Sequence, residues 1–130
     1  MAGDKSDGQP PVVFHPALNV TNVRNLVPLT LDVNNIQYSP WATLFRNTAR
    51  AYNVLDHIDS TIQKPKDIDD ELWNRLDAIV LQWLYGTIST DLLYKILHEK
   101  ATSMVAWDRL CNLFQDNKGT RVVHLESQFG

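Results

Sequence analysis

Cysteine is nearly absent from this sequence. Cys111 is the single cysteine among 130 residues, so no disulfide bond can form within the chain and a disulfide-rich secreted scaffold is excluded. A structural zinc site needs four ligands, most often cysteine and histidine. The four histidines, His15, His57, His98 and His124, are far apart and match no zinc spacing. We therefore expect no metal and no other cofactor.

Long apolar runs and an excess of positive charge are also missing. The uninterrupted apolar stretches are only a few residues long, against about 20 for a membrane-spanning helix, and no apolar segment of a secretory signal follows the polar residues 1–8. The net charge is −3, whereas domains that bind nucleic acid alone are usually basic. We expect a soluble, cytoplasmic protein without a membrane partner, with a nuclear location as the alternative.

Motifs for catalysis are scarce as well. The sequence has no G-x-S-x-G motif and no glycine-rich phosphate loop. Residues 59–61, Asp-Ser-Thr, resemble an aspartic protease triplet, but threonine replaces its glycine, which favours a turn. Cys111 lies in a helical pattern that is typical of a half-buried thiol. We expect no catalytic residue and no small-molecule substrate; an enzyme using Cys111, or the pair Asp56 and Asp59, is the weaker alternative.

The first 37 residues have no helical pattern. Residues 1–11 are polar and contain two prolines, as expected for a disordered tail. Residues 12–37 are rich in β-branched side chains, which disfavour helix, and Pro16 and Pro28 interrupt them. Apolar and polar residues alternate over Leu29–Val33. This pattern predicts an extended arm or a short β segment that lies across the helices.

Helical periodicity begins near residue 38. Ser39 has the side chain of an N-cap, and Pro40 would then occupy the first helical position. Apolar residues follow at spacings of three and four, and the helix is predicted to end between residues 53 and 57. Acidic residues at 67–71 predict the N-terminus of a second helix, because negative charge is favoured there, and Gly86 predicts its end.

Shorter helical patterns fill the rest of the chain. Ser89 or Thr90 can cap a third helix, and residues 101–103 break it and supply the next cap. A fourth helix carries the apolar stripe from Trp107 to Phe114, and a fifth is expected from Thr120 onward. The prediction is an all-α fold, a small irregular bundle of four to five short helices over residues 38–130. Its expected core anchors are Trp41, Phe45, Trp73, Leu76, Trp83, Trp107 and Phe114.

Segments with characteristic aromatic and acidic residues follow one another from Leu29 almost to the end of the chain. They are Ile36–Phe45, with Tyr38 before Trp41; Leu55–Asp59; Trp73, followed by Asp77–Leu84 and Ile88–Ser89; the break at Ala101–Thr102; and Ala106–Leu110, with Phe114, Asn117 and Arg121 before Leu125–Phe129. In this order they resemble the amino-terminal Gag domain of plant copia-type retrotransposons, a family of transposable elements.

The resemblance implies a capsid-like domain that associates with itself in a virus-like particle around the element's RNA. It also implies a lack of enzymatic activity, since protease, integrase and reverse transcriptase lie downstream in such polyproteins. The sequence stops after the first capsid-like lobe, before a second lobe or a zinc knuckle. A fragment, a truncated element copy and a host gene that retains this lobe are the three expectations left open.

The leading hypothesis is therefore a structural domain that acts by self-association or by binding related Gag proteins. Surface side chains of Trp73, Val122 and Phe129 are the expected interface. The alternative is an RNA-binding adaptor. Such an adaptor would use a local basic strip, so we expect RNA contacts to be weak or indirect. The residues of that strip are Arg46, Arg50, Lys64 and Lys66.

Overall fold

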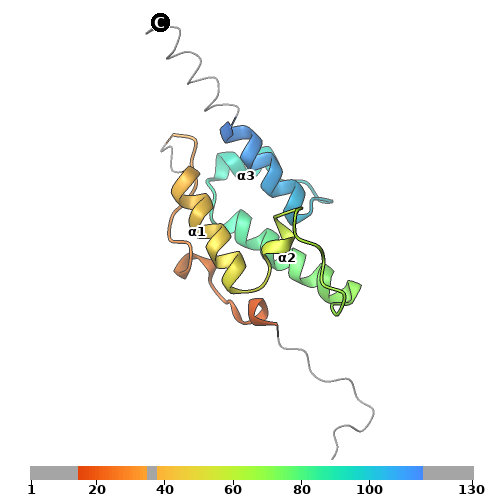
Figure 1. Ribbon diagram of the computed structural model, residues 1–130. Coiled ribbons are helices and arrows are strands. Elements are labelled where there is room, and N and C mark those ends of the chain that lie inside the picture. Colours follow the sequence, from red (N-terminus) through yellow and green to blue (C-terminus); the bar gives the residue numbers. More distant parts are fainter. Residues whose placement is uncertain (1–14, 35–37, 116–130) are drawn as a thin grey trace, which may run out of the picture.

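The computed structural model describes residues 15–34 and 38–115. The predicted tail, the helix predicted from Thr120, and the proposed interface residues Val122 and Phe129 lie outside these ranges. The described chain confirms the all-α prediction, since it contains α-helices and short 3-10 turns but no strand (Figure 1). The α-helices are α1 (Tyr38–Ala51), α2 (Asp70–Gly86), α3 (Thr90–Ile96) and a helix over 103–115; the 3-10 turns are η1 (Pro16–Asn19), η2 (Val23–Asn25) and η3 (Leu55–His57).

The start of α1 differs from the sequence prediction. Tyr38 is already helical, so Ser39 lies inside the first turn and the assignment of Ser39 as the N-cap is wrong. Pro40 is compatible with either start, because no residue of the first turn needs its N–H for an intrahelical hydrogen bond. The presence of proline therefore limited the helix start to a few residues without selecting one.

A Schellman motif ends α1. Asn53 has a φ of 60°, in the left-handed region. The Val54 N–H donates to the Ala49 carbonyl at 2.8 Å, and the Asn53 N–H donates to the Arg50 carbonyl at 3.2 Å. These bonds satisfy carbonyls that the end of a helix leaves without partners, and the buried Val54 and Ala49 supply the apolar contact typical of the motif. Asparagine tolerates this backbone conformation better than most residues.

Side-chain caps begin the three later helices. The Asp69 carboxylate accepts from the Leu72 N–H at 2.8 Å, and the Ser89 hydroxyl accepts from the Leu92 N–H at 3.3 Å. The Thr102 hydroxyl likewise accepts from the Val105 N–H at the start of the helix over 103–115. The predicted acidic start of α2, the Ser89 cap and the break before the next helix are thereby confirmed. These caps hold the helices to short, defined lengths joined by brief loops.

Aromatic rings fill the centre of the bundle. Trp41 and Phe45 on α1 are fully buried, and the centroid of each ring lies 5.4 Å from that of Trp107. Trp83 from α2 meets Phe45 edge to face at 6.5 Å. Six of the seven residues expected in the core are buried here; they are Trp41, Phe45, Leu76, Trp83, Trp107 and Phe114.

The arm before α1 packs against α2. η1 and η2 both contact α2, and Ala17, Val27 and Leu31 are fully buried. In place of a strand, Leu31 forms one isolated parallel bridge with Ile88. The Leu31 N–H donates to the Thr87 carbonyl, and the Ser89 N–H donates to the Leu31 carbonyl, each at 2.8 Å. In Figure 1 the arm's first turn (red) lies at the opposite end of the molecule from α3.

We expect Trp41→Ala to lower the free energy of unfolding by about 3–5 kcal/mol, because it removes a fully buried indole that contacts aromatic rings on two helices. Urea unfolding followed by circular dichroism measures the loss. Asn47→Ala, at an exposed position of the same helix, is the control and should change stability by less than about 0.5 kcal/mol. Equal effects of the two changes would contradict the central place given to Trp41.

The Schellman motif makes a second prediction. Asn53→Ala should lower the free energy of unfolding by about 1 kcal/mol, because alanine has no polar side chain to offset the left-handed conformation. Asn53→Gly should leave stability unchanged or raise it, since glycine adopts a positive φ without steric cost. The same urea titrations test both variants, and a glycine variant less stable than the alanine variant would contradict the left-handed conformation at this position.

Candidate functional site

A buried polar cluster joins η3, α2 and the helix over 103–115. His57 is 1% exposed, and its Nδ1 lies 3.0 Å from Oδ1 of Asp77. The second carboxylate oxygen of Asp77 accepts from the Ser103 N–H at 3.1 Å. The Ser103 hydroxyl donates to the Asp77 backbone carbonyl at 2.7 Å. We call His57, Asp77 and Ser103 the Asp77 cluster.

The residue types of the Asp77 cluster are those of a serine hydrolase triad, but their arrangement is different. In a triad the serine hydroxyl donates to the histidine and remains open to substrate. Here the Ser103 hydroxyl donates to a backbone carbonyl, and Ser103 is fully buried. The carboxylate of Asp77 stands between the other two residues. The cluster therefore satisfies buried polar groups and fixes three elements together; it offers no nucleophile to a substrate.

Trp73 covers the Asp77 cluster from the surface side. Its ring stacks on the His57 ring with 3.8 Å between centroids and 22° between planes, and the Lys64 ammonium lies 5.4 Å from the Trp73 centroid. Trp73 is half-buried. The structure thus places this residue at the edge of the core. Its position in the first turn of α2, beside the loop that carries Lys64, explains why one side of its ring meets loop atoms instead of core side chains.

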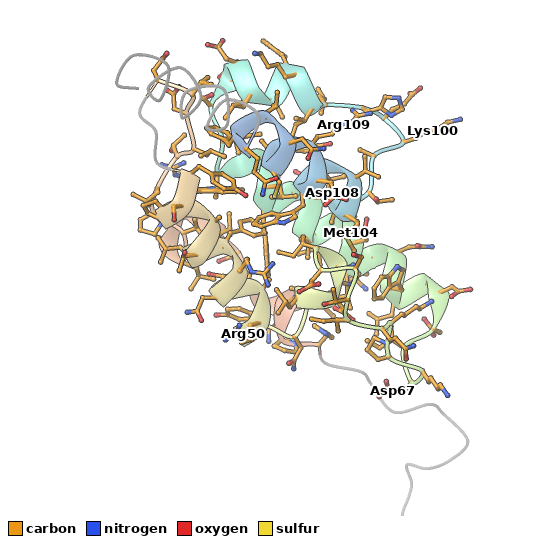
Figure 2. All side chains as sticks on the ribbon, turned by 45° about the horizontal axis from the view of Figure 1, so that its top comes forward. Arg50, Asp67, Lys100, Met104, Asp108 and Arg109 are labelled. Carbon is orange, nitrogen blue, oxygen red and sulfur yellow. The ribbon has the colours of Figure 1, made fainter. Side chains whose placement is uncertain are left out.

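An open groove of about 620 Å³ lies where η3, the end of α1 and the loop before α2 meet. We call it the Asp56 groove. Figure 2 labels two of its residues, Arg50 on α1 and Asp67 in the loop before α2. Its walls combine apolar and polar side chains from the arm, the end of α1, η3, the loop before α2 and the start of α2. They are His15, Arg50, Asn53, Leu55, Asp56, Ile62, Pro65, Asp67, Ile68 and Leu72.

Two titratable groups on the wall of this groove are themselves buried. Burial raises the pKa of the Asp56 carboxyl, and the nearby His57 opposes that rise. Burial lowers the pKa of the His15 imidazole, which the backbone carbonyl of Asn53 partly offsets. The fold therefore favours the uncharged form of both groups at the point where the arm meets η3. Sequence reasoning missed this pair, because no spacing connects residues 15 and 56.

A second groove, of about 490 Å³, runs between the arm and α2. Its apolar floor includes Val23, Ile79 and Trp83, and it carries Arg24 and Arg75 on its walls. The Arg24 guanidinium donates to the Thr30 hydroxyl at 2.8 Å and to the Gly86 carbonyl at 3.3 Å. Arg24 thereby attaches the arm to the end of α2, which leaves it little freedom to bind a ligand.

The predicted basic strip is not brought together as free positive charge. Arg46 pairs with Asp59 at 3.3 Å, and Lys64 pairs with Asp70 at 2.6 Å. The pKa of Asp59 is lowered chiefly by hydrogen bonds from Thr61, with Arg46 contributing less. The other two members, Arg50 and Lys66, are exposed. Two of the four cations are therefore already matched with carboxylates.

Cys111 is paired with a phenol. The Tyr38 hydroxyl lies 3.0 Å from the Cys111 sulfur, and Cys111 is half-buried. Burial raises the pKa of the Cys111 thiol, and the hydrogen bond from Tyr38 opposes the rise. Burial also raises the pKa of Tyr38. A reactive cysteine needs a lowered pKa, so this environment disfavours the thiolate that a nucleophile requires.

Exposed apolar side chains gather on α3 and its C-cap. Tyr94 is 73% exposed and Leu97 is 53% exposed. They are three residues apart, which places them on one side of the helix, away from the buried Leu92 and Ile96. The sequence predicted a third helix here but did not indicate which of its apolar residues would be exposed. α3 is only seven residues long, and its buried residues are Leu92 and Ile96.

Sites for metals or membranes are absent from the part of the chain that the structure describes. Over residues 15–34 and 38–115, no three His, Cys, Asp or Glu side chains are grouped so that they could hold a metal ion. Among the helices in those same ranges, none has the length and apolar character needed to span a bilayer.

We expect Asp77→Ala to lower the free energy of unfolding by about 1–3 kcal/mol, because it leaves the buried His57 imidazole and the Ser103 N–H without their acceptor. Urea unfolding at neutral pH measures this loss. Asp108→Ala, on an exposed position of the helix over 103–115, is the control and should have little effect. A result in which both variants match the parent chain would remove the structural role of the cluster.

Asp56 makes a pH-dependent prediction. Its raised pKa means that the folded chain binds this proton more tightly than the unfolded chain does, so the carboxylate destabilises the fold above that pKa. Asp56→Asn should therefore raise the free energy of unfolding at neutral pH, and the gain should shrink as the pH falls below the raised pKa of Asp56 and vanish below the ordinary pKa of an aspartate in the unfolded chain. Urea unfolding across a pH series tests this. Asp67→Asn, an exposed carboxylate of the same groove, should show no such gain.

Comparison with protein-family models, with curated proteins and with solved structures finds no match for this chain. Its function has to be inferred from its own residues and contacts.

Proposed function

We propose that this chain is a non-enzymatic assembly domain that resembles the amino-terminal lobe of retrotransposon Gag and acts by self-association or by binding related Gag proteins. RNA is contacted only weakly or indirectly in this proposal. Its support from sequence is the ordered set of aromatic helices between Leu29 and Phe129. Its support from the structure is the compact helical lobe and the exposed face of α3.

The exposure of Tyr94 and Leu97 is the single observation that carries the proposal. Large apolar side chains at 73% and 53% exposure leave apolar surface in contact with water, and burying it against another protein is favourable. Tyrosine is enriched among residues that dominate interface energetics, because its ring is large and rigid and its hydroxyl can bond at the edge of the contact. This helix face is therefore the proposed interface, in place of Trp73, which stacks on His57.

A shallow hollow lies on a neighbouring side of α3, toward the helix over 103–115. Arg109 and Lys95 flank a shallow hollow of about 220 Å³ that also contains Ile96 and Leu113. An apolar centre with charged residues near it is the usual arrangement of a protein interface. Figure 2 labels Arg109 and Lys100 at this end of the molecule. The paired state of Arg46 and Lys64 supports protein contact over RNA contact, since phosphate binding needs free cations.

The test is the solution mass of the chain across a concentration series, measured by analytical ultracentrifugation, alone and mixed with a full-length copia-type Gag. We expect concentration-dependent association. The double change Tyr94→Ser with Leu97→Ser should weaken it by about tenfold or more, the loss expected when interface hot spots are removed. Circular dichroism should show an unchanged fold, because both side chains are exposed.

Ile62→Ser is the matched control. Ile62 is also an exposed apolar residue, at 40%, but it lies in the Asp56 groove, so its replacement should leave association unchanged. A chain that stays monomeric at every concentration and does not bind Gag would refute the assembly function. Binding to RNA that survives moderate salt would favour the RNA-adaptor alternative, because purely electrostatic contacts weaken steeply as salt rises.

A further inference from the structure

The His15 ring caps the first turn of the arm. Its Nδ1 accepts from the Ala17 N–H at 3.2 Å, and its backbone carbonyl accepts from the Leu18 N–H at 2.9 Å. Ala17 is fully buried, and η1, to which it belongs, contacts α2. A 3-10 turn of four residues has few hydrogen bonds of its own, so the bond to the His15 ring is one of the few that hold η1 in shape.

The bond to Ala17 requires an unprotonated Nδ1. A neutral imidazole has one nitrogen that donates and one that accepts, whereas both nitrogens of an imidazolium donate. Protonation of Nδ1 would therefore set a ring N–H of His15 against the Ala17 N–H, with 3.2 Å between the two nitrogens. His15 is 8% exposed, so water has little access to either donor. A buried donor left without a partner is costly, and this cost opposes the closed turn.

Charged groups face His15 from three neighbouring elements. They are Arg50 at the end of α1, Asp56 and His57 on η3, and Asp67 in the loop before α2. η1 itself has no acidic or basic residue, and Leu72, which α2 contributes to the same groove, is uncharged. Burial lowers the pKa of His15, which the Asn53 carbonyl and Asp56 oppose and His57 reinforces.

We propose that η1 is a pH-sensitive element: the neutral His15 ring holds it against α2, and protonation of that ring releases it. Release exposes Ala17 and frees the start of the arm. The rest of the arm stays in place, because Val27 and Leu31 are fully buried and make no contact that depends on His15. This proposal does not depend on the assembly function.

The closed turn binds a proton on His15 less tightly than the open turn does, because the pKa of His15 is lowered in the folded chain. η1 is therefore fully closed above the ordinary pKa of histidine and opens as the pH falls through it. Between the open-state and closed-state pKa values, the equilibrium constant for opening rises by up to about tenfold for each unit of pH, since one proton is taken up.

His98 provides a matched comparison. Its Nδ1 accepts from the Lys100 N–H at 3.1 Å, again two residues along the chain, but His98 is exposed. Water can replace that bond when His98 is protonated, so titration of this ring should have no effect on η1.

Nuclear magnetic resonance of the full chain across a pH series tests the proposal. It follows the ring resonances of His15 together with the hydrogen-exchange protection factors of the Ala17 and Leu18 amides. We expect protection to fall by up to about tenfold per unit of pH below neutrality, with the midpoint of the His15 ring. His15→Asn should remove this dependence, because asparagine also caps a turn through its side-chain oxygen and does not titrate. His98→Asn is the control and should leave the dependence unchanged.

Protection that stays constant while the His15 ring titrates would overturn the proposal, as would a loss of protection whose midpoint differs from that of the ring. A loss that persists in His15→Asn would assign the pH dependence to Asp56 or His57 and would also overturn it. If His15→Asn leaves η1 open at neutral pH, the comparison of the two midpoints in the parent chain decides.

Discussion

The rings of Trp41, Phe45 and Trp107 form the contact on which the rest of the structure depends. Each ring of α1 lies with its centroid 5.4 Å from that of Trp107, so the first helix and the helix over 103–115 are held face to face. Aromatic rings at this separation contribute apolar burial and a favourable ring geometry together. The Nε1 of Trp41 is buried without a hydrogen-bond partner among the described residues. Packing at this site therefore outweighs the cost of one unsatisfied donor.

The Asp77 cluster fixes how η3, α2 and the helix over 103–115 are positioned around that apolar core. Ring packing alone tolerates small shifts of one helix against another, whereas the two oxygens of Asp77 reach His57 and Ser103 at fixed distances. The cluster joins residues 20 and 26 positions apart in the chain. Buried polar groups impose this kind of specificity because leaving one unpaired is costly. The histidine, aspartate and serine of this cluster thus have a structural role. The apolar side chains exposed on α3 are the observation on which the proposed function rests.

Apolar burial also bears on the exposed face of α3, the surface that the proposed assembly would use. Tyr94 and Leu97 stand on a short helix with no described residue covering them, so another molecule is the natural partner.

Much of the secondary structure followed from local sequence. The Asp69 and Ser89 caps, the end of α2 at Gly86 and the inward stripe from Leu76 to Trp83 depend on residues a few positions apart, so periodicity and capping chemistry predicted them. α1 ends at Ala51, before the predicted range of 53–57, because the left-handed residue that ends it is asparagine and not glycine.

Only the tertiary structure decided how distant residues meet. The arm, predicted as extended or as a short β segment, forms a single bridge from Leu31 to Ile88. Of the four residues of the predicted basic strip, Arg46 and Lys64 form ion pairs with carboxylates. Trp73, which was predicted in the core, is half-buried and stacks on His57. Asp77 has its partners on η3 and on the helix over 103–115. A sequence pattern records which side of a helix is apolar, and it carries no record of which helix that side will face. That pairing is fixed by packing all the helices at once, because each contact depends on the positions of the others.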